Sequence, residues 1–296
     1  MGEPGLPPAS RLLPWLLLLV LALIWGTSFI LIKKGLRVYS SDEVGALRIG
    51  IASLTLLPFA LRHLRLADPS RWKYLFLSGF LGSFLPAFLF AVAQTHLASR
   101  LAGILHSLTA LFTLLIGALF FGIGITRSHV AGIFLGMAGT VLLLLPGSQG
   151  ASSNALYGLL IILATVCYGT SVNIIKSRLQ TLKPLVMSSL SLMLMAPLAI
   201  GYLFTTPFAF KLAYTPGAGE ALAYIALLAV FSTAVGLILF NKLVHLSSAL
   251  FGSSVTYLIP VFALLWGLLD GETIRLTHLL GMLVILTGIF MVSRSK

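Results

Sequence analysis

The amino-acid sequence predicts an all-α integral membrane protein with ten transmembrane helices, which form two inverted five-helix repeats. Three observations predict this fold class: charged residues are scarce, apolar stretches of membrane-spanning length recur, and one short motif occurs twice. Of the 296 residues, 58% are hydrophobic and 9% are charged, whereas a soluble domain has about 25% charged residues. So few charged side chains cannot cover a water-exposed surface, and we therefore expect the lipid bilayer to surround the chain.

Ten apolar stretches come close to the roughly 20 residues that an α-helix needs to cross a bilayer. Short segments rich in polar residues, proline or glycine separate them. In hydrocarbon every backbone amide and carbonyl needs a partner within the protein, which favours helices. The predicted helices cover residues 13–33, 44–61, 74–94, 101–122, 129–146, 156–175, 185–204, 221–241, 249–269 and 277–292.

The distribution of basic residues predicts the orientation of these helices. Lys and Arg collect in loops that stay in the cytoplasm. If the amino terminus lies inside, the cytoplasmic segments hold about twice as many basic residues as the outer ones. We therefore expect a multi-pass protein with both termini in the cytoplasm. The same bias accounts for the net charge of +12, so we expect no nucleic-acid partner.

A motif in the first predicted helix returns in the sixth. Residues 25–36 read WGTSFILIKKGL, and residues 168–179 read YGTSVNIIKSRL. The identical pairs include Gly26/Gly169, Thr27/Thr170, Ser28/Ser171 and Lys33/Lys176. This repeat divides the chain into two units, predicted at 13–147 and 155–294, and an odd number of helices per unit inverts the second. Inverted repeats are typical of secondary transporters, whose substrate site lies near the middle of the bilayer.

Three stretches in this order resemble the EamA-type transporters of the drug/metabolite transporter superfamily. They are WGTSFILIKKGL, the arginine-containing ALRIGIASLTLLP at 46–58, and GLLDGETIRLTHLLGMLVILTGIFMV at 267–292. The resemblance covers about 13–294. It implies export of amino acids, other small metabolites or drugs across a bacterial inner membrane, through a cavity lined by helices 1, 3, 4, 6, 8 and 9. The chain departs from the family by lacking a proline in HSLTALFTLL and a glutamate in FFGIGITRS, although Glu272 follows the ninth predicted helix.

The residues needed for catalysis are missing from the predicted helices. The chain has only seven acidic residues, and none lies in the middle of an apolar stretch. That disfavours paired catalytic carboxylates and two-metal chemistry, and no HExxH sequence is present. The single cysteine, Cys167, excludes an internal disulfide and a metal site built from cysteines. We therefore expect no enzymatic activity, no catalytic residues, no metal and no cofactor.

Two stripes of aromatic and hydroxyl side chains are the main candidates for binding a substrate. On a helix, Trp25 and Ser28 share one face, and Tyr168 and Ser171 share the matching face in the second repeat. Such surfaces suit a small, partly apolar solute, which can stack and form hydrogen bonds there. The alternative is that the small residues of the motif only let helices pack closely. Asn173 is expected to face protein or water, because an unpaired amide in lipid is costly.

Three further residues belong to the predicted substrate site. His106 is a candidate carrier of a coupling proton, and a neutral, hydrogen-bonded core histidine is the alternative. Ser254 and Tyr257 precede Pro260 in the ninth predicted helix, where the proline frees a backbone carbonyl that can bind a solute. Arg48 lies about one turn inside the second predicted helix, and we interpret it as reaching the outer interface.

Lys33, Asp270 and Glu272 form a predicted gate. Lys33 ends the first predicted helix at the outer face, and both acids follow the ninth. We expect Lys33 to pair with one of them when the outer mouth is shut, which would shift the balance between the two states of a transporter. Lys176, at the inner face, is expected to have no such partner and to anchor at the interface. Anchoring is also the alternative for Lys33.

These observations leave three functional hypotheses in order of preference. The first is a secondary transporter that moves a small organic solute by alternating access. The second is an exchanger of an anionic metabolite of the nucleotide-sugar or sugar-phosphate type, which should need several basic residues at mid-depth. The third is a membrane scaffold that transports nothing. Glycines in the fifth and tenth predicted helices indicate either a packing scaffold or the seam of a homodimer.

Overall fold

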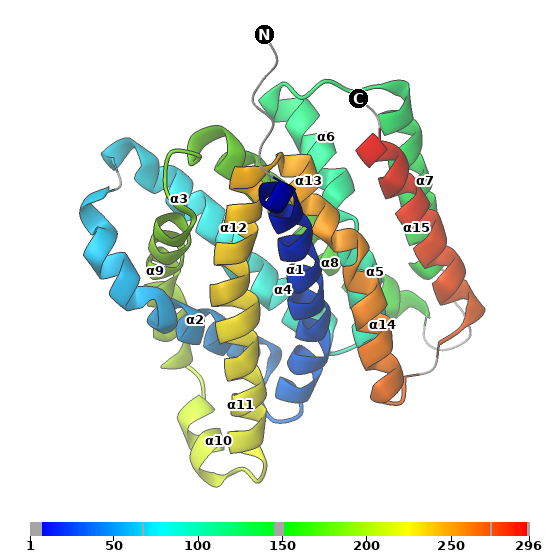
Figure 1. Cartoon of the computed structure of the whole chain (residues 1–296). Coiled ribbons are helices and arrows are strands. Elements are labelled where there is room, and N and C mark those ends of the chain that lie inside the picture. The colour runs from blue at the N-terminus through cyan, green and yellow to red at the C-terminus, as the bar shows by residue number, and fades with distance from the viewer. Residues whose placement is uncertain (1–7, 67, 145–150, 273, 295–296) are drawn as a thin grey trace.

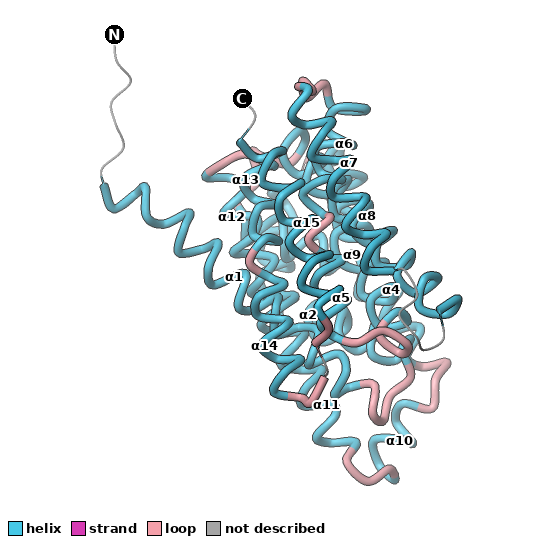
Figure 2. Tube along the Cα trace, turned by 90° about the vertical axis from the view of Figure 1, so that its right-hand side faces the viewer, coloured by secondary structure: helices cyan, strands magenta, loops and turns pink. Residues whose placement is uncertain are grey.

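A computed structural model describes residues 8–66, 68–144, 151–272 and 274–294. These residues form helices and connecting loops, and no strand occurs among them. Figures 1 and 2 show a single bundle in which most long helices run roughly side by side. The predicted all-α class is confirmed, whereas the predicted repeat boundary at residue 147 falls outside the described residues.

The helices follow one another in two comparable series. The first series comprises α1 (Pro8–Gly35), α2 (Ser41–His63), η1 (Leu64–Leu66), η2 (Pro69–Arg71), α3 (Trp72–Gly79), η3 (Phe80–Phe84), α4 (Leu85–Ala93), α5 (Ser99–His106), α6 (Thr109–Phe121) and α7 (Arg127–Leu144). The second comprises α8 (Ala151–Arg178), α9 (Pro184–Leu203), α10 (Phe208–Tyr214), α11 (Ala218–Leu227), η4 (Leu228–Val235), α12 (Gly236–Leu246), α13 (Ala249–Ser253), η5 (Ser254–Tyr257), α14 (Ile259–Leu269) and α15 (Leu276–Arg294).

Eight helical segments of the described chain are long and apolar enough to cross a membrane. They run from Leu12 to Gly35, Ser41 to His63, Pro69 to Ala93, Ser99 to Phe121, Leu156 to Arg178, Pro184 to Leu203, Ala218 to Leu246 and Ala249 to Leu269. A shorter apolar helix covers Leu276–Met291. Ten spans therefore require that α7 and α15 also cross the bilayer, and this count remains a prediction.

The two series pack against each other along the whole bundle. The extensive contacts between them pair α2 with α9, α1 with α14, α6 with α8, and α7 with α15. Glycines permit the close approach of α7 and α15, because a Cβ on Gly288 would lie 2.5 Å from the carbonyl oxygen of Gly132 and 2.7 Å from the nitrogen of Gly136. The glycines of these two helices thus act inside the chain, which agrees with the packing-scaffold interpretation.

Helix packing also explains the glycines of the repeated motif. A Cβ on Gly26 would collide with Cβ of Phe262, and one on Gly169 would lie 2.8 Å from the backbone of Phe112. Neither position has room for a side chain. The small residues of the motif therefore allow contact between helices, as the packing interpretation states, while their aromatic and serine neighbours can serve another purpose.

Four membrane-spanning segments change helical geometry near their middles. Two of them contain π-helical turns, η3 between α3 and α4 and η4 between α11 and α12. The other two are interrupted, one between α5 and α6 and one by the 3₁₀ turn η5 between α13 and α14. The changes occur in corresponding segments of the two series. Irregular turns of this kind shift side chains and backbone groups and are frequent at functional sites.

Candidate solute-binding cavity

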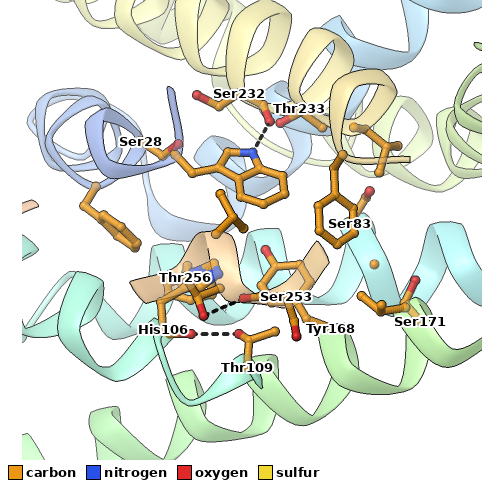
Figure 3. Close-up of a pocket in the computed structure, with 18 of the residues that line it drawn as sticks. Ser28, Ser83, His106, Thr109, Tyr168, Ser171, Ser232, Thr233, Ser253 and Thr256 are labelled. Atoms are coloured by element: carbon orange, nitrogen blue, oxygen red, sulfur yellow. Dashed lines mark hydrogen bonds between the residues drawn. The ribbon is translucent and has the colours of Figure 1, made fainter. Parts of the chain in front are cut away.

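The four irregular segments surround a cavity in the middle of the bundle. Its lining comes from α1, α2, α5, α6, α8, α12 and the irregular turns η3, η4 and η5, with further residues from α4 and α13. About half of the lining residues are aromatic or aliphatic, and serine and threonine hydroxyl groups lie between these side chains (Figure 3). The cavity has a volume of about 80 Å³, room for several water molecules. Pockets that hold drug-sized ligands measure about 300–1,000 Å³, so the helices must separate before a larger solute can enter.

Trp25 forms one wall of the cavity and is held by the π-helical turn. Its Nε1 donates a hydrogen bond to the carbonyl oxygen of Ser232 at 2.9 Å, and its ring lies 5.2 Å from that of Phe240. The Ser232 hydroxyl in turn donates to the carbonyl oxygen of Ile24 at 3.2 Å. These two bonds fasten α1 to η4, as Figure 3 shows for the indole nitrogen. Ser28, one turn further along α1, also lines the cavity.

His106 and Tyr168 form a stacked pair in the cavity wall. Their ring centroids are 5.3 Å apart with an angle of 14° between the planes, and the rings of Phe29 and Phe90 lie 5.9 and 5.4 Å from the imidazole. The Nδ1 atom of His106 is buried and has no hydrogen-bond partner among the described residues. The alternative considered from the sequence was a hydrogen-bonded core histidine, and Nδ1 of His106 does not form such a hydrogen bond in the described chain.

Ser171 completes the predicted stripe on α8. Its hydroxyl donates to the carbonyl oxygen of Ser78 at 3.1 Å and lies so close to η3 that a Cβ on Gly82 would collide with Ser171 Oγ. Both Ser171 and Gly82 line the cavity. The structure thus brings together five of the predicted substrate-site residues, which are Trp25, Ser28, His106, Tyr168 and Ser171.

Three other predicted residues lie outside the cavity lining. Asn173 is buried between helices, where its Nδ2 donates to the carbonyl oxygens of Thr113 and Gly169, both at 2.8 Å. The Ser254 hydroxyl donates to the carbonyl oxygen of Phe251 at 2.7 Å, and the Tyr257 hydroxyl donates to that of Ile289 on α15 at 3.3 Å.

The helix break in the ninth predicted helix explains this difference. A continuous α-helix would keep one face toward the cavity, but the 3₁₀ turn η5 changes the angle between successive residues. As a result Ser253, Val255 and Thr256 line the cavity. Pro260 lies in the first turn of α14 and so begins a new helix, where its missing N–H has no cost.

Arg48 lines the cavity, so its interpretation as a side chain reaching the outer interface was wrong. Its Nε donates to the Thr233 hydroxyl of η4 at 2.8 Å. It is the one Lys or Arg among the described lining residues, and they include no Asp or Glu. The interpretation from the sequence rested only on the depth of Arg48 in its predicted helix. The side chain points into the cavity because the Thr233 hydroxyl, on another helical segment, accepts its hydrogen bond.

Further hydroxyl groups of the cavity escaped the sequence analysis. Ser83 and Ser232 line it from the two π-helical turns. The number of residues that separates Ser83 from Ser232 also separates Ser99 from Ser248, another pair of serines at matching places in the two repeats. That internal correspondence is the signal that could have identified them, because a serine kept at matching places in two repeats marks a matching position in space.

A cluster of five charged side chains joins three elements at one end of the cavity-forming helices. Lys33 Nζ lies 2.6 Å from Asp270 Oδ2 and 2.9 Å from Glu272 Oε1. Lys34 Nζ lies 2.5 Å from Asp270 Oδ1, and Arg100 Nη1 lies 3.0 Å from Glu272 Oε2. The predicted ion pair of Lys33 is therefore present, and it extends to both acids. We call these five side chains the acidic-end cluster.

Glu272 is the centre of this cluster. Its side chain is only 5% exposed, and its two carboxylate oxygens also accept the backbone N–H groups of Ser99 and Arg100 at 3.0 and 3.3 Å. Burial alone would raise the pKa of Glu272, but the hydrogen bonds from Lys33 and from these two backbone groups outweigh it and lower the pKa. Hydrogen bonds from Lys33 and Lys34 likewise lower the pKa of Asp270.

Lys176, the counterpart of Lys33, has a different environment. Its Nζ donates to the carbonyl oxygens of Val244 at 3.1 Å and Ser247 at 2.5 Å, at the end of α12. No ion pair with an acidic residue involves it in the described chain. Lys176 thus caps the carboxyl end of a helix, and its role as an anchor at the interface stays a prediction.

Comparison with known proteins decides the family of this chain. Residues 12–145 and 156–294 each match the EamA-like transporter family. The chain belongs to this family. The double match confirms the resemblance seen in the sequence and shows a duplicated architecture. The matched ranges lie close to the predicted repeats at 13–147 and 155–294, whose boundaries stay a prediction.

Several relatives of the EamA-like chain are named as transporters. A protein named "Uncharacterized transporter" from Archaeoglobus fulgidus is 26% identical over 288 residues, which cover 95% of this chain and 99% of the relative. The uncharacterized inner membrane transporter YedA of Escherichia coli K12 is 27% identical over 284 residues, covering 94% and 90%. A probable amino-acid metabolite efflux pump of the same organism is 29% identical over 176 residues, covering 58% and 56%.

A solved crystal structure has the same fold. It matches with a TM-score of 0.66 over 93% of the EamA-like chain and 94% of the matched chain, at 18% identity. At this identity the likeness concerns the fold alone. Together with the apolar helices, the family and its relatives make the chain a multi-pass membrane protein of a transporter family.

Proposed function

We propose that this EamA-like chain is a secondary transporter that exports a small, partly apolar organic solute across a bacterial inner membrane by alternating access. It would have ten transmembrane helices in two inverted repeats and both termini in the cytoplasm. The observation that carries the proposal is the cavity at the four helix irregularities, where rings and hydroxyl groups meet in the middle of the bundle. Irregular helices that line a cavity between repeats are typical of substrate sites in secondary transporters.

The acidic-end cluster supports the alternating-access part of the proposal. It joins the end of α1, the start of α5 and the residues after α14. We propose that Lys33, Asp270 and Glu272 form the gate and that the cluster breaks when the cavity opens at this end. Ion pairs that exist in one state only change the balance between states by their differential free energy.

Export is favoured over uptake by the name of one relative, a probable amino-acid metabolite efflux pump. The second candidate, an exchanger of nucleotide-sugars or sugar-phosphates, is disfavoured because Arg48 is the one Lys or Arg in the described cavity lining. Several basic residues would be expected around a ligand with multiple negative charges. A coupling proton on His106 and a homodimer remain part of the hypothesis.

Flux through proteoliposomes tests the proposed function. The purified protein is reconstituted, and a panel of labelled amino acids, organic acids and apolar drugs is measured with and without a pH gradient. Saturable flux that exceeds that of protein-free liposomes is expected for at least one class of solute. Absence of saturable flux for the whole panel, from protein that is folded by its melting curve, would contradict the transporter and favour the scaffold.

A further inference from the structure

Arg48 presents a charge to the cavity that no described acidic residue neutralises. The described lining includes no Asp or Glu, and no ion pair of the described chain involves Arg48. A guanidinium keeps its charge in proteins, and a charge at membrane depth is costly unless it is paired. An anion that enters the cavity would therefore supply the partner that the protein itself does not.

The hydrogen bond to Thr233 determines which part of the guanidinium is available. Nε donates to the Thr233 hydroxyl at 2.8 Å, and that hydroxyl lies 3.5 Å from the carbonyl oxygen of Leu228, its acceptor in the π-helical turn. The two Nη atoms form no hydrogen bond with any other described residue. Their outer edge is the planar pair of donors that binds both oxygens of a carboxylate.

The rest of the cavity specifies the body of such a ligand. Besides the imidazole of His106, five aromatic rings line it, those of Trp25, Phe29, Phe90, Tyr168 and Phe240. Rings of this kind bind aromatic and apolar groups by stacking and burial. The described lining holds no carboxylate that could pair with an ammonium group. The described lining thus offers one site for a negative charge, a large apolar surface and no carboxylate for a positive charge.

We propose that Arg48 binds the carboxylate of an organic monocarboxylate whose aromatic or apolar body lies among these rings, with Thr233 as the positioning residue. This rests on the proposed function, because it names the class of solute that the cavity would carry. One guanidinium matches one negative charge. It also repels organic cations, so the same residue would discriminate against cationic drugs.

Isosteric probes test this charge preference in the complete protein. Flux of labelled phenylacetate into proteoliposomes is measured in competition with phenylacetamide, which is neutral, and phenethylamine, which is cationic. Binding of all three is measured separately as the shift in melting temperature of the purified protein. Phenylacetate should bind roughly ten- to hundredfold more tightly than either isostere. L-Phenylalanine, which adds an ammonium group, should bind more weakly than phenylacetate.

Variants assign the preference to Arg48. Arg48→Gln should weaken phenylacetate roughly tenfold or more and weaken phenylacetamide by a clearly smaller factor. A melting transition like that of the parent shows that the variant is folded. Thr233→Val keeps the charge and removes its positioning hydroxyl, and should weaken phenylacetate severalfold, whereas Thr233→Ser should restore it. If Arg48→Gln does not fold, the Thr233 pair decides the proposal.

The outcomes separate this inference from the proposed function. Saturable flux with equal affinity for the three probes leaves the transporter intact and overturns the role of Arg48. Binding of phenylacetate that depends on Arg48, without flux of any solute, supports the site and contradicts the transporter. Phenylacetate that neither binds nor moves, or a preference that survives in Arg48→Gln, overturns the inference.

Discussion

Lys33 and Lys176 close the two copies of one motif, yet they contact different kinds of groups at opposite ends of the bundle. Lys33 contacts the carboxylates of Asp270 and Glu272, near the end of α14 at the bottom of Figure 1. Lys176 contacts the carbonyl oxygens of Val244 and Ser247, at the α12–α13 junction at the top of Figure 1.

The difference shows how a duplicated fold can acquire unequal ends. In the first repeat the stretch FFGIGITRS, at the place that corresponds to Asp270 and Glu272, contains no acid. Lys176 therefore meets backbone carbonyls at the end of α12, whereas Lys33 meets carboxylates. Both contacts join separate elements and can break when those elements move, but in the described chain only the contact of Lys33 is an ion pair. The acidic end is therefore the one that we expect to open and close with the aid of charge.

The largest effect is expected from Glu272→Gln. The neutral glutamine amide cannot balance the positive charges of Arg100 and Lys33. Leaving a buried charge without its partner costs about 1–3 kcal/mol or more. The measurement uses a Cys167→Ser background with Ser83→Cys as a reporter in the cavity. An impermeant thiol reagent applied at the acidic end should label the reporter thiol roughly tenfold faster in the Glu272→Gln variant than in its parent.

Glu220→Gln provides the matched control for this experiment. Glu220 is an acid at the start of α11, and its carboxylate accepts a hydrogen bond from the Tyr224 hydroxyl at 3.0 Å, away from the cluster. Its variant should label at the parent rate. Equal acceleration by both variants would show that the loss of an acid, and not the loss of the cluster, opens the cavity.

A smaller effect is expected from Lys33→Gln, because the Lys33 side chain is 36% exposed and exposed ion pairs are typically worth less than about 1 kcal/mol. Labelling at the acidic end should rise by roughly two- to fivefold. The Lys33→Gln/Glu272→Gln double variant should label more slowly than the product of the two single effects predicts, since both substitutions remove the Lys33–Glu272 contact. Purely additive effects of the two substitutions would contradict the gate.

Lys176→Gln is the test of the comparison itself. This variant loses a helix-end cap, so its melting temperature should fall slightly, while labelling from the acidic end should not change. A rate increase equal to that of Lys33→Gln would remove the distinction between the two ends.

Acid should open the acidic end at a pH that the carboxylates determine. The pKa values of Asp270 and Glu272 lie below their ordinary 3.8 and 4.5. A carboxylate whose pKa is lowered in the closed cluster stabilises that cluster at pH values above its ordinary pKa. This stabilisation is lost as the pH falls through the lowered pKa. The labelling rate per thiolate, which removes the pH dependence of the reporter thiol itself, should therefore be constant from about pH 5 to 8 and rise only below about pH 4. A transition near neutral pH would contradict the assignment.

The smallest predicted change concerns His106. Because the cluster does not titrate near neutral pH, any pH dependence of flux between about pH 5.5 and 8 should come from another group, and the imidazole in the cavity wall is the candidate. His106→Gln keeps a hydrogen-bonding group and removes titration, so its flux should not vary with pH in this range. A pH dependence identical to that of the parent would dismiss His106 as the coupling group.

The fold could be predicted from the sequence more completely than the site. Apolar stretches and the repeated motif depend on composition and order, and they predicted the helical bundle and its duplication. The orientation that the basic residues predict stays a prediction. Trp25 and Tyr168 were found because helical periodicity places them on one face with serines. Lys33 and its acids were found because both follow the ends of predicted helices around one cavity.

The remaining site residues depend on geometry that the order of residues does not reveal. Ser254 and Tyr257 leave the cavity because a 3₁₀ turn replaces the α-helix at that point. Arg48 turns inward because Thr233, on a distant segment, accepts its hydrogen bond. The π-helical turns that place Thr233 and Ser83 have no distinctive sequence. Thr233 could therefore be found only in the structure, whereas Ser83 could have been found through Ser232, its counterpart in the second repeat.

The central claim, that the cavity is the path of the transported solute, is tested most directly by a pair of tryptophan variants. Trp25 lines the cavity, whereas Trp266 on α14 donates to the Thr27 hydroxyl at 2.9 Å and lies outside the lining. In proteoliposomes, Trp25→Ala should raise the half-saturating concentration of a transported solute roughly 5- to 150-fold, the loss of a stacking and burial contact of about 1–3 kcal/mol. Trp266→Ala should leave it within about twofold. Equal half-saturation for the parent protein and Trp25→Ala, at normal protein levels, would contradict the claim.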